Sequence, residues 1–393
     1  MMQNQATMST IDATDVSRRK WDVIVAGAGP AGSVAARQLA LRGVAVLLVD
    51  KAEFPRRKVC GCYLSGSALA TLQSIGLGNL CHQSGAPCVT RVRIGTQGRT
   101  VCLTLPAGAA LSRETLDTAL AKSAVDAGAE LLCHTAATVG RLTSSGRSFD
   151  LKCGNQSVAS SARMIVVADG VGGQSLKDCS DVRFKVATRS RVGIAAMTDT
   201  LPDGYVTGTI HMAIGRAGYV GALQLETGSL DVAAALDPTV LKHFSPGELA
   251  QKIVDESGLP RLDGLEQVRW RGTPPLTRTP TRPGASRLLL IGDAAGYVEP
   301  FTGEGMSWAI ASGCAVVPFV LESLSSGSDD LAKSWGTEHR RLLGSRQRLC
   351  RLLTRGLRSP LLAGVSVRTL AMLPSLATPF INRLNRPPSL ESA

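Results

Sequence analysis

Aromatic residues make up only 4% of this 393-residue chain, and they are not interleaved with its basic residues. Proteins that bind single-stranded nucleic acid use aromatic side chains as stacking platforms beside a basic groove. The most apolar stretch near the C-terminus, residues 361–381, is interrupted by Arg368 and Pro374. A membrane-spanning helix needs about 20 consecutive apolar residues. We therefore expect no nucleic-acid partner and no transmembrane helix.

Cysteine and histidine lack the spacings of a disulfide framework or a metal site. The ten cysteines are irregularly spaced, and Cys60 and Cys62 form the only close pair. No second close cysteine pair and no histidine pair supply further ligands, so we expect reduced thiols and no metal. Residues 1–20 contain no apolar stretch that would suit a signal peptide. We expect a flexible leader there and a cytoplasmic protein.

Acidic residues are scarce at the C-terminus, where residues 339–393 contain ten arginines and one glutamate. The net charge of +12 is therefore concentrated in the tail. Residues 340–358 have helical periodicity, with leucines on one side and arginines opposite except for Arg346. Such a helix can pack on the protein, lie on the inner face of a membrane or bind a partner protein. We expect a basic helical region over residues 331–393.

A strand, a glycine-rich turn and a helix follow one another near the start. Residues 21–26 form a short apolar run that is typical of a buried parallel strand. The turn consists of Gly27, Ala28, Gly29, Pro30, Ala31 and Gly32. Its first glycine permits a tight turn, its second lets the backbone approach a pyrophosphate, and its third lets the helix pack on the strand. This pattern predicts a dinucleotide-binding turn.

A second apolar strand, residues 44–49, ends at Asp50, which lies 18 residues after Gly32. An acidic group at this point accepts hydrogen bonds from the ribose hydroxyls of an adenosine. The order of strand, helix, strand and acid predicts a Rossmann-type fold. It does not by itself distinguish FAD from NAD.

Two later segments favour a flavin. Residues 287–291 read as a strand and are followed by Gly292, Asp293 and a glycine-punctuated loop that leads into a helix. Residues 166–170 read as a strand that ends in Asp-Gly. Together with the N-terminal turn, these segments resemble the FAD-dependent family that includes p-hydroxybenzoate hydroxylase, flavin-dependent halogenases and geranylgeranyl reductases.

The resemblance implies one bound FAD and assigns roles to individual residues. Asp293 would bind the ribityl chain, and Arg113 matches the arginine that the family places against the cofactor; a solvated arginine is the alternative. The helix that starts near Gly305 would direct its free N–H groups at the anionic end of the reduced flavin. Asp169 is either a cofactor contact or a simple turn residue. The full predicted cofactor-binding set is Gly27, Gly29, Pro30, Ala31, Gly32, Asp50, Lys51, Arg113, Ala137, Asp169, Asp293, Gly303, Gly305 and Met306.

The expected fold class is α/β, with a Rossmann-type FAD-binding domain of the glutathione-reductase-like (GR2-like) kind. Short strands separated by glycine turns predict an inserted, mainly antiparallel sheet that binds substrate. The FAD-binding domain is expected over residues 21–89, 112–180 and 282–330. The inserted sheet is expected over residues 90–111 and 181–281.

The loop after the second strand indicates which branch of this family the chain resembles. Residues 58–61, Lys-Val-Cys-Gly, resemble a Lys-x-Cys-Gly segment of geranylgeranyl reductases, and the loop from Pro300 to Gly305 is also closer to that branch. We therefore predict Cys60, Gly61 and Pro300 as catalytic-site residues. Three roles stay open for Cys60: it lines the active site, it packs without a function, or it takes part in redox chemistry. Its basic neighbours would lower the pKa of the thiol in each case, so a low pKa does not distinguish these roles.

One segment departs from that branch. The reductases have Tyr-x-Trp-x-Phe-Pro in the substrate sheet, whereas this chain keeps Tyr219 but has Gly221 and Leu223 in place of the Trp and Phe. A lipid or polyketide is then as good a substrate as an isoprenoid. The halogenase sequence Trp-x-Trp-x-Ile-Pro is missing, and the lone His211 is expected to be a packed or surface residue.

The leading hypothesis is an FAD-dependent reductase or dehydrogenase. Its expected partner is a small molecule with a bulky apolar structure. Alternatives are an NAD(P)H-dependent FAD monooxygenase and a flavin-binding adaptor or electron carrier without turnover. Because the sequence has one glycine fingerprint, NAD(P)H is expected only as a transient reductant.

Overall fold

Strand β1 (Trp21–Ala26) lies at the centre of a sheet and pairs in parallel with a strand on each side. The computed structural model describes residues 8–299, 301–326 and 331–387. The sheet runs in the order β17 (Gly284–Ala285), β18 (Leu288–Leu290), β9 (Gln156–Val167), β1, β2 (Val46–Val49) and β6 (Glu130–Leu132). The parallel strands bring their carboxyl ends to one edge, where α/β proteins bind ligands.

Helices cover one face of this first sheet and a hairpin covers the other. Val23 and Val25 belong to an apolar cluster with the helices, whereas Ile24 packs with the hairpin. The helices are α2 (Pro30–Ala40), α5 (Arg113–Asp126), α7 (Gly305–Ala315) and α8 (Val317–Ser326), and the hairpin strands are β7 (Thr135–Leu142) and β8 (Arg147–Cys153). The alternation of β1 side chains thus places apolar groups in both layers.

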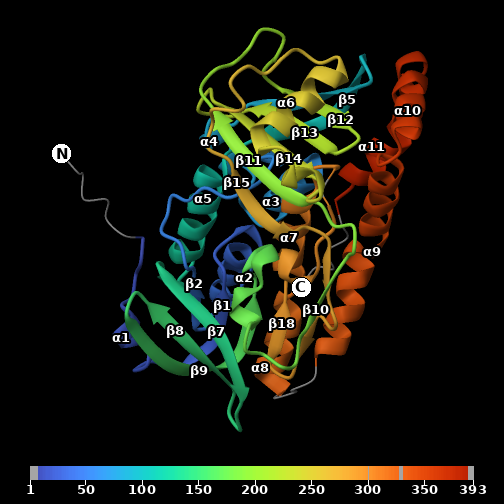
Figure 1. The fold of residues 1–393 in the computed structure, drawn as a ribbon. Coiled ribbons are helices and arrows are strands. Elements are labelled where there is room, and N and C mark those ends of the chain that lie inside the picture. Colours follow the sequence, from blue (N-terminus) through green and yellow to red (C-terminus); the bar gives the residue numbers. More distant parts are fainter. Residues whose placement is uncertain (1–7, 300, 327–330, 388–393) are drawn as a thin grey trace, which may run out of the picture.

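A second sheet lies above the first and is mainly antiparallel (Figure 1). Its order is β15 (Arg271–Pro275), β11 (Val192–Thr198), β14 (Leu230–Leu236), β13 (Gly218–Gln224), β12 (Thr209–Gly215), β4 (Cys88–Thr96), β5 (Arg99–Ala110) and β3 (Tyr63–Leu64). Only β12 and β4 pair in parallel among its strands. A small antiparallel pair, β10 (Phe184–Val186) and β16 (Arg278–Pro280), joins the segments that connect the two sheets.

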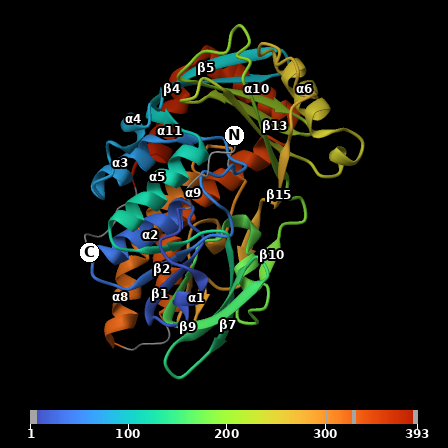
Figure 2. The same cartoon turned by 90° about the vertical axis from the view of Figure 1, so that its left-hand side faces the viewer.

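The two faces of the second sheet have different neighbours because side chains alternate along each strand. Ala213, Val220 and Val232 face α6 (Pro246–Ser257), which covers the outer face in Figure 2. A capping box formed by Ser245 and Glu248 begins this helix. The opposite face is turned toward the first sheet. The sequence pattern had predicted only strands in this part of the chain.

The remaining helices are short or lie at the C-terminus. The short ones are α1 (Ala13–Val16), α3 (Gly66–Ser74), α4 (Leu80–Gln83) and the 3-10 turns η1 (Gly170–Gly172), η2 (Gln174–Leu176), η3 (Val240–Lys242), η4 (Gly292–Ala295) and η5 (Pro374–Ala377). The C-terminal ones are α9 (Ala332–Gly356), α10 (Pro360–Met372) and α11 (Thr378–Asn385). These three lie beside both sheets in Figure 1, in red and orange.

Helix α9 differs in part from the predicted amphipathic pattern. Leu342 and Leu343 are buried against Trp308, as a packed leucine face requires. Leu352, however, is 67% exposed, and Arg358 turns inward to within 3.2 Å of Glu299. Of the leucine face predicted over residues 340–358, Leu342 and Leu343 are thus buried, Leu353 and Leu357 are partly buried, and Leu352 is exposed.

Over its described residues, the N-terminal segment is not the flexible leader that the composition suggested. Ile11 and Val16 are buried in the cluster beneath the hairpin, and Val16 has no exposed surface. The backbone N–H of Thr10 donates to Leu131 O at 2.9 Å, and the N–H of Cys133 donates to Ser9 Oγ at 3.0 Å. These contacts tie the segment to β6. A short polar stretch shows no periodicity from which such docking could be predicted.

Replacing Val16 by Ala is expected to lower the free energy of unfolding by about 1–3 kcal/mol, because two buried methyl groups are lost. Thermal unfolding of the full-length chain measures this as a lower melting temperature. The exposed Asp12→Asn is the matched control and leaves the melting temperature unchanged. Equal melting temperatures for V16A and the wild type would show that the segment is not docked.

Candidate functional site

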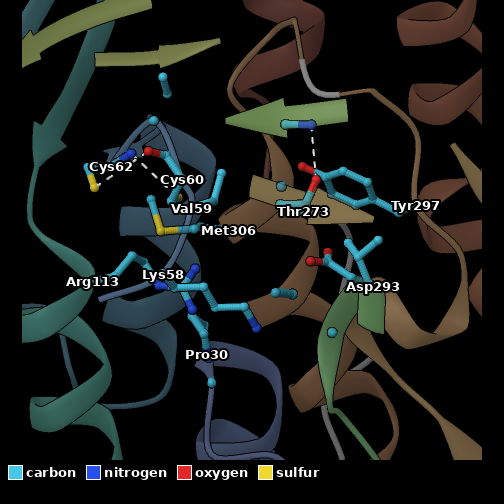
Figure 3. Close-up of a pocket in the computed structure, with 18 of the residues that line it drawn as sticks. Pro30, Lys58, Val59, Cys60, Cys62, Arg113, Thr273, Asp293, Tyr297 and Met306 are labelled. Carbon is cyan, nitrogen blue, oxygen red and sulfur yellow. Dashed lines mark hydrogen bonds between the residues drawn. The ribbon is translucent and has the colours of Figure 1, made fainter. Parts of the chain in front are cut away.

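A cavity of about 700 Å³ lies between the carboxyl edge of the first sheet and the inner face of the second. Figure 3 shows it lined by residues from distant parts of the chain, among them Pro30, Lys58 and Asp293. Pro30 begins α2, Lys58 belongs to the loop after β2, and Asp293 belongs to η4 after β18. The cavity thus extends from the glycine turn to the Gly-Asp segment.

Two glycines of the turn are required by the backbone alone. Gly27 has a φ of +109°, and a Cβ there would lie 2.4 Å from the carbonyl oxygen of Ala168. A Cβ on Gly32 would lie 1.8 Å from the carbonyl oxygen of Gly27. These two residues let β1, α2 and β9 approach one another.

Gly29 has a different role because it faces the cavity. A Cβ on it would lie 3.6 Å from an Arg56 nitrogen and 3.7 Å from an Arg113 nitrogen. Gly29 is also the N-cap of α2, and no side chain caps this helix. The first N–H groups of α2 are therefore free beside two guanidinium groups, which is the donor set that a pyrophosphate needs.

Charged side chains form a buried network beside this turn. Asp50 Oδ2 accepts from the N–H of Ala28 at 2.8 Å and lies 3.3 Å from Arg56. Arg56 also lies 3.2 Å from Asp117, which has no exposed surface. Arg113 binds both oxygens of Asp117 at 2.8 Å. Arg56 therefore connects the end of β2 to α5, and Arg113 is a buried, paired cation rather than a solvated one.

The opposite end of the cavity contains a carboxyl group, an amine and a second helix N-terminus. Burial raises the pKa of Asp293 and lowers the pKa of Lys58. Lys58 extends toward Asp293 across the cavity in Figure 3. Helix α7 begins at Gly305, and no side chain caps it, so its first N–H groups are free. A ribityl hydroxyl can bind Asp293 there, and an anionic ring edge can bind the helix start.

Asp169 stabilises the turn after β9 and also lines the cavity. Its Oδ2 accepts from both the N–H and the Oγ of Ser175 at 2.8 Å. Its Oδ1 is buried without a hydrogen-bond partner among the described residues. Burial raises the pKa of this carboxyl group. One oxygen thus stabilises the turn, and the other is available to a ligand.

Cys60 lies where the loop after β2 crosses the cavity. The Cys62 N–H donates to the Cys60 sulfur at 3.4 Å, and a hydrogen bond from the Cys62 thiol lowers the pKa of Cys60 to about 6, with Arg113 contributing. Asp231 of β14 lies beside this pair, and burial raises its pKa well above the usual value. Its Oδ2 has no partner in the described part of the chain. A cysteine whose pKa is lowered and a carboxyl group whose pKa is raised therefore share this wall.

The wall that the second sheet supplies is apolar. Its cavity-facing residues alternate along the strands, as a sheet with one buried face requires. They include Val92, Ile94, Leu103, Leu105, Ile210, Met212, Gly221, Leu223, Ala233 and Ala235. Gly221 and the two alanines leave the centre of the wall open. An apolar molecule can therefore lie against the sheet.

The structure brings nearly all of the predicted site residues to this cavity. Those that line it are Gly27, Gly29, Pro30, Ala31, Asp50, Lys51, Cys60, Gly61, Arg113, Ala137, Asp169, Asp293, Gly303, Gly305 and Met306. Gly32 supports the turn from behind and does not line the cavity. Pro300 lies outside the described residues. His211 is buried on the α6 side beside Tyr205, away from the cavity, as a packed residue.

Sequence reasoning missed four residues of the site. Arg56 and Lys58 were considered only as neighbours of Cys60, and Asp117 and Asp231 were not considered. The i, i+4 spacing of Arg113 and Asp117 in a predicted helix is a signal for their ion pair. Nothing in the sequence indicates that Asp231, on a strand 171 residues after Cys60, meets the Cys60 loop.

Comparison with known proteins agrees with this geometry. Residues 20–345 match a family model described as FAD binding domain. Menaquinone reductase from Mycobacterium tuberculosis strain H37Rv is 28% identical over 384 residues, which cover 90% of this chain and 88% of that protein. Digeranylgeranylglycerophospholipid reductase 1 from Methanothermobacter thermautotrophicus is 28% identical over 354 residues, which cover 84% of this chain and 82% of that protein.

Solved structures share the fold at low identity. The p-nitrophenol 4-monooxygenase from Pseudomonas putida has a TM-score of 0.75 at 15% identity and covers 93% of this chain and 98% of its own. A flavoprotein/dehydrogenase from Cytophaga hutchinsonii has a TM-score of 0.72 at 17% identity, and the match covers 93% of this chain and 96% of that one. These likenesses confirm the expected α/β architecture.

Gly29→Val is expected to weaken FAD binding by about tenfold or more, because a branched side chain would occupy the space between Arg56 and Arg113. Titration of the apoprotein with FAD, followed by flavin fluorescence, measures the affinity. Gly356→Val is the control, since a Cβ at Gly356 meets no atom within 4 Å. Unchanged affinity for G29V would place the pyrophosphate elsewhere.

Alkylation of Cys60 by iodoacetamide is expected to rise with pH around a midpoint of about 6. Below that pH the sulfur is a thiol, and above it the sulfur is a nucleophilic thiolate. Mass spectrometry of the Cys60 peptide measures the rate. Cys62→Ala removes the hydrogen bond that the Cys62 thiol donates to the Cys60 sulfur, so the midpoint of the alkylation profile should rise. A wild-type midpoint near the ordinary value of about 8.5 would contradict the assignment.

Proposed function

The chain belongs to the FAD binding domain family, and on that premise we propose that it is a reductase that saturates a carbon–carbon double bond in a polyprenyl lipid. The family and the donor set of the cavity make it an FAD-dependent oxidoreductase. The relatives named above are reductases of menaquinone and of digeranylgeranylglycerophospholipid. Both compounds carry polyprenyl chains, and an apolar substrate is what this cavity suits.

The observation that carries the proposal is the juxtaposition of an apolar wall with the flavin end of the cavity. The wall contributes Ile210, Met212 and Leu223, and the flavin end contributes Asp293 and the start of α7. A chain of methyl-branched units can bind along the sheet by apolar contact. One of its double bonds would then lie beside the isoalloxazine ring.

Saturation of a double bond needs a hydride on one carbon and a proton on the other. Reduced FAD, when bound, supplies the hydride. The protein must supply the proton, and Asp231 is suited to do so because burial raises its pKa, which favours the protonated acid, and its Oδ2 has no partner in the described structure. After each turnover the carboxylate of Asp231 regains its proton from solvent.

An external reductant must regenerate the reduced flavin. We propose that NAD(P)H does so by transient contact, with the protein acting in the cytoplasm at the inner face of a membrane. The FAD monooxygenase is the second candidate function, because the structure of p-nitrophenol 4-monooxygenase shares the fold.

The two candidates differ in product. Anaerobic incubation of the FAD-loaded chain with dithionite and a polyprenyl lipid in D₂O is expected to add two deuterium atoms to each reduced double bond, because dithionite supplies only electrons and both hydrogens come from solvent. Mass spectrometry of the lipid measures this. Incubation with NADPH and ¹⁸O₂ is the parallel arm. Incorporation of ¹⁸O without double-bond reduction would establish the monooxygenase and reject the reductase.

Gly221→Trp is expected to lower turnover of a polyprenyl lipid by about tenfold or more while FAD affinity is unchanged, because the indole would fill the open centre of the wall. A Cβ at Gly221 lies 3.3 Å from the end of the flexible Met212 side chain, so the sheet can accept the substitution. Ala213→Val, which lies on the α6 side and does not line the cavity, is the control for altered packing and should leave turnover unchanged. Normal turnover by G221W would place the substrate away from this wall.

A further inference from the structure

Large apolar side chains are exposed mainly on one surface near the C-terminus. Fourteen are exposed in the described part of the chain, and eight of these lie between Leu352 and Phe380. Seven of the eight belong to the segment Pro360–Asn385, which we call the elbow. The side chains of Leu361, Val365, Met372, Leu373 and Phe380 are between 52% and 78% exposed.

The elbow is a bent pair of helices that is fixed to the protein along one side. Helix α10 and the segment Pro374–Asn385 meet at 119°. Val367 and Ala377 are buried against Val101 and Leu103 of β5. Figure 1 shows α10 and α11 at the outer edge of the molecule. The exposed side chains therefore lie on the outer face of packed helices and not on an unfolded tail.

Hydrogen bonds hold both ends of the elbow in place. Gln97 Nε2 donates to the carbonyl oxygen of Pro360 at 3.3 Å. The N–H of Gly66 donates to Asn385 Oδ1 at 3.2 Å. Arg346 of α9 donates to the carbonyl oxygen of Leu384 at 3.4 Å. These contacts fix which face of the elbow is exposed.

The chain segment that contains the elbow carries charged residues of one sign. Residues 339–387 contain ten arginines and no acidic residue. Arg348, Arg355, Arg368 and Arg383 are exposed. Exposed apolar side chains among arginines are the combination by which a helix binds in the interface of an anionic bilayer. A second copy of the same surface would be repelled by its equal charge.

The elbow is also continuous with the cavity. Ile381, Leu384 and Asn385 of α11 line it together with Leu353 of α9. Leu373 and Phe380, on the same bent segment, are exposed. An apolar molecule that leaves a bilayer at the elbow can therefore reach the cavity along α11.

We propose that the elbow is a bilayer-docking surface: its exposed apolar side chains insert among the acyl chains of an anionic membrane, and its arginines contact the headgroups. The predicted basic helix α9 contributes mainly charge, because Leu342 and Leu343 are buried in the protein. This proposal concerns lipid binding alone and holds whichever reaction the flavin performs.

Flotation with vesicles of phosphatidylcholine and phosphatidylglycerol tests the surface with the FAD-loaded full-length chain. The wild type is expected to float with these vesicles and much less with vesicles of phosphatidylcholine alone. The triple variant Leu361→Gln, Val365→Gln, Met372→Gln should lose binding by about tenfold or more, because three inserting side chains become polar. Its flavin absorbance and melting temperature should match those of the wild type.

The control is Leu142→Gln, Val186→Gln, Val206→Gln, which changes three exposed apolar side chains outside the elbow. It is expected to float like the wild type. Equal flotation of the two triple variants, or failure of the wild type to bind anionic vesicles, would overturn the proposal. A wild-type dimer that the elbow variant converts to a monomer, with no vesicle binding, would instead identify the elbow as a contact between copies.

Discussion

The guanidinium group of Arg56 lies between the carboxylates of Asp50 and Asp117, and the arrangement of the cavity depends on this buried pairing. It ties the loop after β2 to α5. That loop then crosses the cavity and delivers Lys58 and Cys60 to it. Loss of one partner of a buried ion pair costs about 3–5 kcal/mol, since the other charge remains buried and unpaired. The same network places two cations beside the free N-terminus of α2, so one set of contacts serves both folding and anion binding.

The nucleotide half of the molecule could be predicted from the sequence because its constraints are local. Gly32 is required by a contact within the turn, Asp50 directly follows β2, and Asp293 follows β18 by three residues. Parallel strands then bring these residues to one edge whatever lies between them. The family resemblance added the identity of the ligand, which local physics could not supply.

The substrate half could be predicted only as a mainly antiparallel sheet. The meeting of Asp231 with Cys60 depends on strand order in the second sheet, which alternation of side chains does not reveal. The docked N-terminal segment and the inward turn of Arg358 depend on tertiary contacts between polar stretches. The elbow was visible in the sequence only as an apolar stretch broken by Pro374. Its exposed face depends on how α10 packs against β5.

The central claim is that reduced flavin in this cavity passes its electrons to a double bond of an apolar chain. Stopped-flow absorbance of the reduced, FAD-loaded protein without oxygen tests it most directly. Mixing with a polyprenyl lipid should restore the absorbance of oxidised flavin, and mixing with the fully saturated analogue should leave the flavin reduced. If the flavin stays reduced with both lipids and is oxidised only when oxygen is admitted, the account is wrong.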